Sequence, residues 1–244
     1  MMRILLLGGT TEASALAKQL AMAGRDAVFS YAGRTARPAS QPLPMRQSGF
    51  GGVAGLVEYL HCEGITHVVD ATHPFAAQMS ANAVAACSEA GVALCALERQ
   101  PWQAGEGDNW ISVGDMQGAV DALHVEGARV FLAIGKQNLD IFAAKPDNHY
   151  LLRLVDAPEA ALPLPDCEVV VARGPFDAAS DQALMAEHGI THVVAKNAGG
   201  AGAEAKLQAA RALGVPIVMI DRPQVPDRMI LRSVGEVMTW LEHS

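Results

Sequence analysis

The sequence has few aromatic residues, few charges and no long apolar run. Of 244 residues, 5% are aromatic and 18% are charged, while 50% are hydrophobic. A chain with this balance can bury a core, so wholesale disorder is excluded. Its apolar residues are mainly Ala, Val, Leu and Ile, which is typical of parallel sheets covered by helices. No segment approaches membrane-spanning length, so we expect no transmembrane helix.

Cysteine is also scarce. The four cysteines, Cys62, Cys87, Cys95 and Cys167, form no CxxC pair. We interpret them as buried free thiols of a reducing compartment and expect neither a disulfide frame nor a zinc site. The net charge of −8 argues against a broad nucleic-acid surface, because neutralising phosphates requires a basic face. The N-terminus lacks a signal-peptide pattern, so we expect a cytoplasmic protein.

Short apolar runs alternate with helical spacing along the first half of the chain. Strands are predicted at Arg3–Leu7, Asp26–Tyr31, His67–Asp70 and Ala93–Leu97. Helices are predicted at Thr11–Ala23, Val53–Cys62 and Pro74–Ala90. This order indicates an α/β fold with a doubly wound, mainly parallel sheet and right-handed crossovers.

The alternation pauses at residues 99–109, where Pro, Gly and charged residues replace the apolar pattern. We interpret these residues as a linker between residues 1–98 and residues 110–244. Beyond it, strands are predicted at residues 111–113, Arg129–Ile134, His149–Leu154, Glu168–Ala172, His192–Ala195 and Pro216–Ile220. Helices are predicted at Met116–His124, Asp177–His188, Ala203–Leu213 and Glu236–His243. The segment after Arg222 could return to either half.

The second half repeats parts of the first. EGITHVV at residues 63–69 recurs as HGITHVV at residues 188–194, and RILLLG from Arg3 resembles RVFLAIG from Arg129. A looser echo links residues 90–99 with residues 213–222. Similar αβ turns can converge on similar sequences, but three echoes in one order favour two related Rossmann-like halves.

The first βα turn has the residues of a dinucleotide site. It reads Gly8, Gly9, Thr10, Thr11 and Glu12, directly after the first strand and at the start of the first helix. Glycines let the backbone approach a pyrophosphate, and the helix N-terminus offers free N–H groups. The full GxGxxG pattern is absent, so an ordinary glycine turn is the alternative.

The end of the second strand favours NADPH over NADH. NAD-binding proteins usually carry Asp or Glu there, to hold the ribose 2′-hydroxyl. This chain has Ser30, Arg34 and Arg37 instead, and a guanidinium suits a phosphate. The alternative is that both arginines are solvated loop charges.

The third predicted strand ends in DATHPFA, with Asp70, Ala71, Thr72 and His73 at the carboxyl edge of the sheet. Ligands of open α/β sheets bind at this edge. His73 could donate a proton or bind a ligand amide; it could equally be a packed turn residue, with Thr72 as a helix cap.

Cationic residues recur near predicted strand ends of the second half, which lacks a glycine-rich phosphate loop. This pattern favours a crevice for a multiply anionic ligand, although scattered surface charge is the alternative. The candidate residues are Lys136, Arg153, Arg173, Lys196, Asn197, Gly199 and Arg222.

Four motifs in order, GGTTEA, DATHPFA, ARGPF and KNAGG, resemble those of the precorrin-6A reductase family of cobalamin biosynthesis. The match runs over nearly the whole chain. The resemblance implies an enzyme that uses NADPH to reduce one double bond of the precorrin-6A macrocycle, giving precorrin-6B. The implied substrate is a tetrapyrrole fringed with acetate and propionate carboxylates. KNAGG has Ala198 where we expect serine in the family, which weakens a hydroxyl role there.

The resemblance also implies roles for individual residues. The GGTTE residues would bind the dinucleotide, Asp70, Thr72 and His73 would lie near the nicotinamide, and cations of the second half would face the substrate. These cationic and polar residues are Lys136, Arg173, Lys196 and Asn197. His73 is the first candidate for the proton donor, since histidine titrates near neutrality. Bound water or solvent are alternatives. Lys196 is the second candidate catalytic residue, although it could act purely as an electrostatic clamp.

Two other functions remain open on the sequence alone. Another NADP(H) oxidoreductase or epimerase would usually carry Tyr-x-x-x-Lys, and Tyr31, Tyr59 and Tyr150 have no lysine four residues on. A sensor would bind NADP(H) without turnover, and it would not need the cations of the second half.

Overall fold

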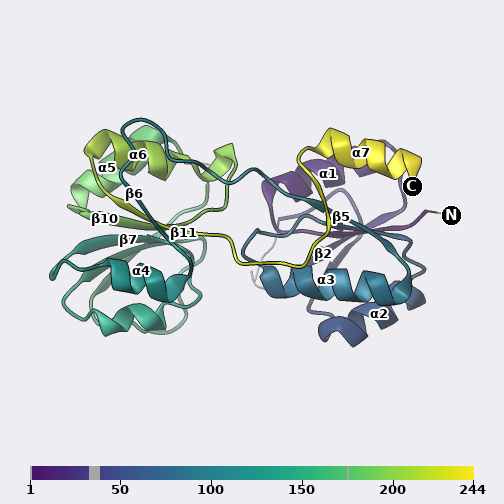
Figure 1. Ribbon diagram of the computed structural model, residues 1–244, viewed down its shortest axis with the longest axis horizontal. Coiled ribbons are helices and arrows are strands. Elements are labelled where there is room, and N and C mark those ends of the chain that lie inside the picture. Colours follow the sequence, from purple (N-terminus) through teal and green to yellow (C-terminus); the bar gives the residue numbers. More distant parts are fainter. Residues whose placement is uncertain (1, 33–38, 175) are drawn as a thin grey trace. The chain divides into compact units, whose positions relative to one another are not determined.

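The computed structural model describes residues 2–32, 39–174 and 176–244, and these divide into two compact units (Figure 1). The first unit contains the chain up to Gln100 together with Gln224–Ser244, and the second contains Pro101–Pro223. Each unit is built on one six-stranded sheet, and every strand pair is parallel. The predicted α/β class with two Rossmann-like halves is confirmed.

The first sheet has the strand order β12-β5-β4-β1-β2-β3. Its strands are β1 (Ile4–Leu7), β2 (Ala27–Tyr31), β3 (Met45–Gln47), β4 (His67–Asp70), β5 (Ala93–Leu97) and β12 (Met229–Leu231). Helices α1 (Thr11–Met22) and α7 (Val234–His243) cover one face, and α2 (Gly52–Cys62) and α3 (Ala77–Ala90) cover the other (Figure 1). Strand side chains alternate between two apolar clusters, one beneath each helix pair.

The second sheet has the order β6-β11-β10-β7-β8-β9. Its strands are β6 (Trp110–Val113), β7 (Arg129–Ala133), β8 (His149–Leu154), β9 (Cys167–Val171), β10 (His192–Lys196) and β11 (Ile217–Ile220). Helices α5 (Ala178–Glu187) and α6 (Ala205–Leu213) pack on one face, while α4 (Met116–Ala122) lies on the other (Figure 1). The short 3-10 turns are η1 (Asp140–Ala144) and η2 (Ala201–Ala203).

Each sheet has one edge strand that follows, in the chain, a strand of the other sheet. β6 follows β5 in the chain but pairs with β11, whereas β12 follows β11 but pairs with β5. The predicted second half, residues 110–244, is therefore too long by Gln224–Ser244. The reason is packing: Val237 and Leu241 of α7 are buried in the core beneath α1.

The predicted linker also belongs largely to a folded unit. Residues from Pro101 onward fall in the second unit, and Trp102 packs against its core. The indole Nε1 of Trp102 donates to the Gly200 carbonyl at 3.1 Å. Proline, glycine and charge in this stretch mark irregular backbone rather than an independent connection.

The sequence echo corresponds to one repeated local structure. In the first unit, Arg3 N donates to Thr66 Oγ1 at 3.1 Å, and Thr66 N donates to the Arg3 carbonyl at 2.9 Å. Arg129 and Thr191 make the same two bonds in the second unit, at 3.0 and 2.8 Å. The repeated GITH segments therefore dock each helix-to-strand turn onto the neighbouring strand.

The third long helix starts later than predicted. α3 begins at Ala77 instead of Pro74, because residues 74–76 form a tight turn in which Ala76 N donates to the His73 carbonyl at 2.7 Å. This turn leads from the end of β4 to the helix and presents His73 at the surface.

No helix in the described ranges is long and apolar enough to cross a membrane. The same ranges contain no cluster of three or more His, Cys, Asp or Glu side chains suited to a metal ion. All four cysteines carry free thiols, but only Cys87 and Cys95 are buried. The expectation of burial is wrong for Cys62, which is exposed at the end of α2, and for the half-buried Cys167.

Candidate functional site

The strand order of the first sheet reverses between β1 and β4, which is where open α/β sheets bind ligands. The segment Gly8–Glu12 follows β1, and Asp70–His73 ends and follows β4. One hydrogen bond joins the two segments, because Thr10 Oγ1 donates to the Ala71 carbonyl at 2.8 Å. The fold thus brings together two motifs that lie about 60 residues apart in sequence.

The two glycines of the first turn are required for different reasons. A Cβ on Gly8 would lie 2.0 Å from the Phe29 ring, so the backbone runs directly over an aromatic side chain. Gly9 has φ of +127°, and a Cβ there would meet no atom within 4 Å. Gly8 is needed for packing and Gly9 for conformation, and Gly9 leaves its backbone open to a ligand.

The first turn of α1 combines a helix cap with an ion pair. Thr10 Oγ1 accepts from Ala13 N at 3.1 Å and so caps the helix. Glu12 accepts from Thr11 Oγ1 at 3.0 Å and from Arg99 Nη1 at 3.1 Å. The sequence analysis did not identify Arg99 as a site residue. Arg99 is nevertheless the last residue of the repeated segment 90–99, as Arg222 is of its counterpart 213–222. Its guanidinium places a positive charge beside the N-terminus of α1.

Ser30 lies at the end of β2, as predicted, and it is buried. Its hydroxyl accepts from Arg46 Nη1 at 2.9 Å, because β2 and β3 pair with Ser30 opposite Arg46. Arg46 was not predicted, since residues 39–51 show no periodic pattern. Arg34, the predicted phosphate-binding residue, lies outside the described residues.

Arg46 also holds the loop that follows β3. Its guanidinium donates to the backbone carbonyls of Ser48 and Gly49 and lies 3.8 Å from the centre of the Phe50 ring. Burial lowers the pKa of Arg46 from its usual value, while the nearby Tyr59 raises it by a smaller amount. A half-buried cation is thereby held beside the end of β2.

Asp70 ends β4 and orders the turn that follows. Its Oδ1 accepts from Thr72 N at 3.1 Å and from Thr72 Oγ1 at 2.7 Å. Its Oδ2 is buried without a hydrogen-bond partner among the described residues. The pKa values of Cys87 and Cys95 are raised to about 12, mainly by burial and to a smaller extent by the Asp70 charge. The carboxylate therefore faces the interior and positions Thr72.

His73 is exposed at the tip of the same turn. Its Nδ1 accepts from Phe75 N at 3.2 Å, and the two rings lie 5.8 Å apart. A ring nitrogen that accepts a hydrogen bond carries no proton, so the neutral imidazole has its proton on Nε2. Nε2 is then the nitrogen suited to donate to a ligand.

The strand order of the second sheet reverses between β7 and β10. Lys196 is the last residue of β10, and its Nζ donates to the Ile134 carbonyl at 3.0 Å, beyond the end of β7. Lys136 lies two residues after Ile134 and is exposed. Two predicted cations thus lie at the equivalent edge of the second unit.

Asn197 and Arg222 hold the segment after β10 in place. Asn197 accepts from Trp102 N at 2.8 Å and donates to the Trp102 carbonyl at 3.0 Å. Arg222 donates to the carbonyls of Asn197 and Ala198 at 2.9 and 3.0 Å. Gly199 follows with φ of +69°. These bonds give Asn197 and Arg222 a structural role, and their contact with a substrate stays a prediction.

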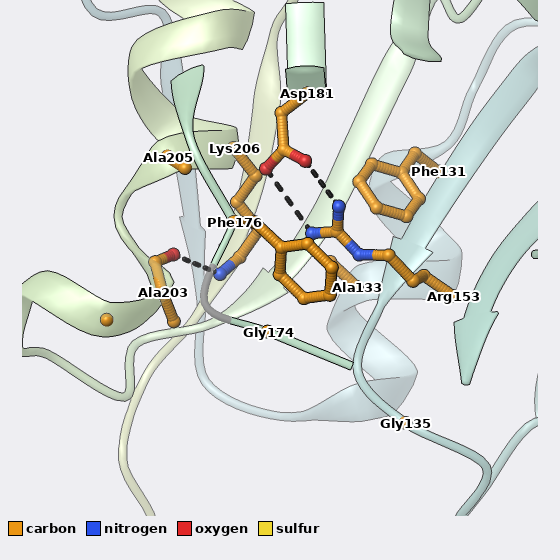
Figure 2. Close-up of a pocket in the computed structure, with 11 residues that line it drawn as sticks. Phe131, Ala133, Gly135, Arg153, Gly174, Phe176, Asp181, Ala203, Ala205 and Lys206 are labelled. Atoms are coloured by element: carbon orange, nitrogen blue, oxygen red, sulfur yellow. Dashed lines mark hydrogen bonds and ion pairs between the residues drawn. The ribbon is translucent and has the colours of Figure 1, made fainter. Parts of the chain in front are cut away.

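Arg153 and Arg173 are in different surroundings. Arg153 pairs through two nitrogens with the buried carboxylate of Asp181, and its guanidinium lies 3.6 Å from the centre of the Phe176 ring (Figure 2). Arg173 is exposed and lies 3.9 Å from Asp156. Arg153 therefore belongs to a packed wall, whereas Arg173 has a solvated guanidinium.

That wall is part of a pocket of about 200 Å³ within the second unit (Figure 2). Sequence reasoning identified only Arg153 in it. Its lining residues come from β7 and β8 and the turn after β7, from Gly174 and Phe176 after β9, from η2, and from helices α5 and α6. They are Phe131, Ala133, Gly135, Arg153, Gly174, Phe176, Asp181, Gly202, Ala203, Ala205 and Lys206.

Comparison with known proteins gives a consistent result over the full length. Residues 3–242 match the family model described as precorrin-6x reductase CbiJ/CobK. The chain is 66% identical to the precorrin-6A reductase of Rhodobacter capsulatus, over 99% of this chain and 96% of that protein. It is 45% identical to the precorrin-6A reductase of a Sinorhizobium species, over 99% and 93% of the two chains. A solved structure titled CobK precorrin-6A reductase superposes with a TM-score of 0.96 at 65% identity, covering 100% of this chain and 97% of that one.

Proposed function

The chain belongs to the precorrin-6x reductase family, and we propose that it reduces precorrin-6A with NADPH in cobalamin biosynthesis. The observation that carries this function is 66% identity to a precorrin-6A reductase over nearly the whole of both chains. A TM-score of 0.96 to a solved precorrin-6A reductase supports the same assignment.

The residues of the first unit fit a dinucleotide. Gly9 leaves open space at the carboxyl edge of β1, and the capped N-terminus of α1 supplies backbone N–H groups for a pyrophosphate. Gly8 keeps the turn close to the sheet. We assign the dinucleotide contacts to Gly8, Gly9, Thr10 and Thr11, with Glu12 held by Arg99 at the rim.

The end of β2 is the place for the ribose 2′-phosphate of NADPH. Ser30 lies there, Arg46 contributes a positive charge beside it, and Arg34 follows four residues after Ser30 in the sequence. Arg46 is committed to several hydrogen bonds, so Arg34 is the better candidate for direct contact with the phosphate. No carboxylate stands where an NAD-binding protein would need one.

NADPH, when bound, supplies a hydride from its nicotinamide ring to an electrophilic carbon of the macrocycle. The chain has to hold the two reactants in register and provide a proton to the adjoining carbon. His73 is our candidate for the proton, which its protonated imidazolium would give from Nε2 once Nδ1 has released its bond from Phe75 N. Asp70, Ala71 and Thr72 act on the site by shaping the turn that carries His73.

The second unit provides cations for the carboxylates of the substrate. Lys196 and Lys136 lie at the edge where its strand order reverses, and Arg173 is exposed beyond β9. Lys196 acts in this proposal as an electrostatic clamp, because its ammonium is already anchored by the Ile134 carbonyl. A cytoplasmic location is consistent with the free thiols.

The test is NADPH oxidation by the purified full chain, followed through the absorbance of reduced nicotinamide, with enzymatically prepared precorrin-6A. Oxidation that requires the tetrapyrrole and is much slower with NADH is the expected result. Binding of NADPH without oxidation would instead support a sensor. Oxidation with a different carbonyl or olefinic substrate, and none with precorrin-6A, would identify another NADP-dependent oxidoreductase.

A further inference from the structure

We propose that the pocket of the second unit is a subsite for one carboxylate arm of the substrate, and that Lys206 recognises that carboxylate. This inference rests on the proposed function, since it concerns how precorrin-6A is held. The pocket lies wholly within Pro101–Pro223 and is therefore formed by one unit alone.

The position of the pocket is that of a ligand site. Gly135 follows β7 much as Gly9 follows β1, and both have positive φ, +77° and +127°. Arg153 on β8 and the loop after β9 complete the same carboxyl edge. The second unit thus carries a pocket at the strand ends that, in the first unit, contribute to the dinucleotide crevice.

The charge of the pocket suits a single carboxylate. The ionisable side chains that line it are Arg153, Asp181 and Lys206, two cations and one anion. Arg153 and Asp181 form an ion pair with each other in the wall. Lys206 is only 7% exposed; its ammonium donates to the Ala203 carbonyl and lies 5.0 Å from the centre of the Trp102 ring.

An ammonium group is a compact positive charge whose N–H groups suit a carboxylate. A carboxylate that enters the pocket would balance its net positive charge and accept a charge-assisted bond from Lys206. Figure 2 shows Lys206 and Arg153 reaching the same pocket from α6 and β8.

The size and the walls of the pocket suit an arm rather than a macrocycle. A volume of about 200 Å³ is below the range of roughly 300–1,000 Å³ that holds whole drug-sized ligands. The rings of Phe131 and Phe176 and the methyl group of Ala133 line it, and these can pack against methylene groups. An acetate or propionate arm has this composition: one or two methylenes and a terminal carboxylate.

The first experiment compares precorrin-6A binding by wild type and by Lys206→Met, using equilibrium dialysis with tetrapyrrole absorbance and no NADPH. Methionine keeps the length and the apolar stem of lysine but removes the charge. We expect the dissociation constant to rise about tenfold or more, and Lys206→Arg to keep most of the affinity. Lys145→Met is the matched control, because Lys145 precedes β8 and so lies at the opposite edge of the sheet.

A second pair of variants leaves Lys206 in place. Gly202 lines the pocket from an exposed turn, and a Cβ there would meet no atom within 4 Å. Gly202→Asp adds a carboxylate at the pocket, whereas Gly202→Asn adds a side chain of the same shape without charge. We expect Gly202→Asp to bind precorrin-6A several times more weakly than Gly202→Asn, because the new carboxylate repels the arm or competes for Lys206.

The outcomes separate this inference from the proposed function. The subsite is overturned if wild type and a folded Lys206→Met bind precorrin-6A equally well, or if the two Gly202 variants do. NADPH oxidation by wild type upholds the reductase in that case. Weakened binding in Lys206→Met and Gly202→Asp without any NADPH oxidation by wild type supports the subsite and overturns the reductase. Absence of precorrin-6A binding by wild type overturns both.

Discussion

The phenyl ring of Phe29 fills the space that a side chain at Gly8 would need. A Cβ on Gly8 would lie 2.0 Å from one ring atom and 2.2 Å from another, and Phe29 is completely buried. The ring belongs to the core beneath α1, so it cannot rotate out to solvent. The turn to which we assign the dinucleotide contacts is thus supported directly by the packed interior.

Gly8→Ala should therefore weaken both folding and NADPH binding. Overpacking a core of this density costs about 1–3 kcal/mol, and the displaced turn would move Gly9 and the N-terminus of α1. We expect a lower free energy of unfolding in urea and a dissociation constant for NADPH about tenfold higher. Gly114→Ala is the control, because a Cβ there meets no atom within 4 Å. Unchanged NADPH affinity in Gly8→Ala would refute the argument.

The parts of the fold that sequence patterns predict are those where a short apolar run is followed by a turn residue and a helical pattern. β1, β4, β7 and β10 are central strands whose inner residues are buried and apolar, while polar residues or glycine mark their ends. β3 and β12 escaped prediction because they are three-residue edge strands. Met45 and Met229 in them are 49% and 52% exposed, and no alternation can be recognised over so short a span.

The site was only partly predictable for a related reason. GGTTEA and the DATH turn are contiguous motifs directly after central strands, so their meeting at one edge of the sheet could be predicted from the strand order. Lys206 resembles an ordinary surface charge on a helix. Its burial depends on Trp102, which arrives from the stretch interpreted as a linker. Arg46 likewise owes its place to pairing with Ser30 across β2 and β3.

His73→Asn should slow turnover without affecting NADPH binding. Asparagine can still accept a hydrogen bond from Phe75 N, but its amide cannot protonate a carbon atom of the substrate at neutral pH. General acid catalysis by a side chain typically contributes at least about 10²-fold, so we expect a loss of that order in kcat. Steady-state kinetics across neutral pH should show wild-type kcat falling as pH rises, and this dependence should vanish in the variant.

His61→Asn serves as the control for that experiment, since His61 is exposed near the end of α2, away from the crevice. If His73→Asn keeps the wild-type kcat over the whole pH range, the proton comes from water instead.

Arg34→Ala should change the preference between the two nicotinamide cofactors. A charge-assisted bond to a phosphate contributes about 1.5–3 kcal/mol, which corresponds to roughly 10- to 100-fold in affinity. NADPH should lose this factor, whereas NADH, which lacks the 2′-phosphate, should lose little. Titrations of the two cofactors measured by nicotinamide fluorescence provide the comparison. Equal losses for NADPH and NADH would exclude Arg34 as the phosphate-binding residue.

The thiols of Cys87 and Cys95 should remain protonated and unreactive in the folded protein. Their pKa values are raised to about 12, first by burial and then by the Asp70 charge. The native state holds these protons more tightly than the unfolded chain does. The stability that this contributes is fully present below the ordinary thiol pKa of 9.0 and is lost as pH rises toward about 12.

Alkylation at about pH 8 should accordingly label the exposed Cys62 rapidly and the two buried thiols only on unfolding. The free energy of unfolding should fall above pH 9, and less steeply in a Cys87→Ala, Cys95→Ala double variant. Rapid alkylation of all thiols in the native state would contradict the burial of this part of the first unit.

Breaking the ion pair between Arg153 and Asp181 should strongly lower the free energy of unfolding of the second unit. Asp181 is 1% exposed, and its partner guanidinium is packed against Phe176, so Asp181→Asn leaves a buried cation without its counter-charge. Breaking such a pair costs roughly 3–5 kcal/mol, whereas replacing both partners with apolar residues of similar volume is often neutral. We therefore expect Asp181→Asn to be severely destabilising in urea, and the Arg153→Met, Asp181→Leu double variant to recover most of the loss. Additive losses in the double variant would show instead that both side chains stabilise the unit independently, through packing and not through their mutual charge.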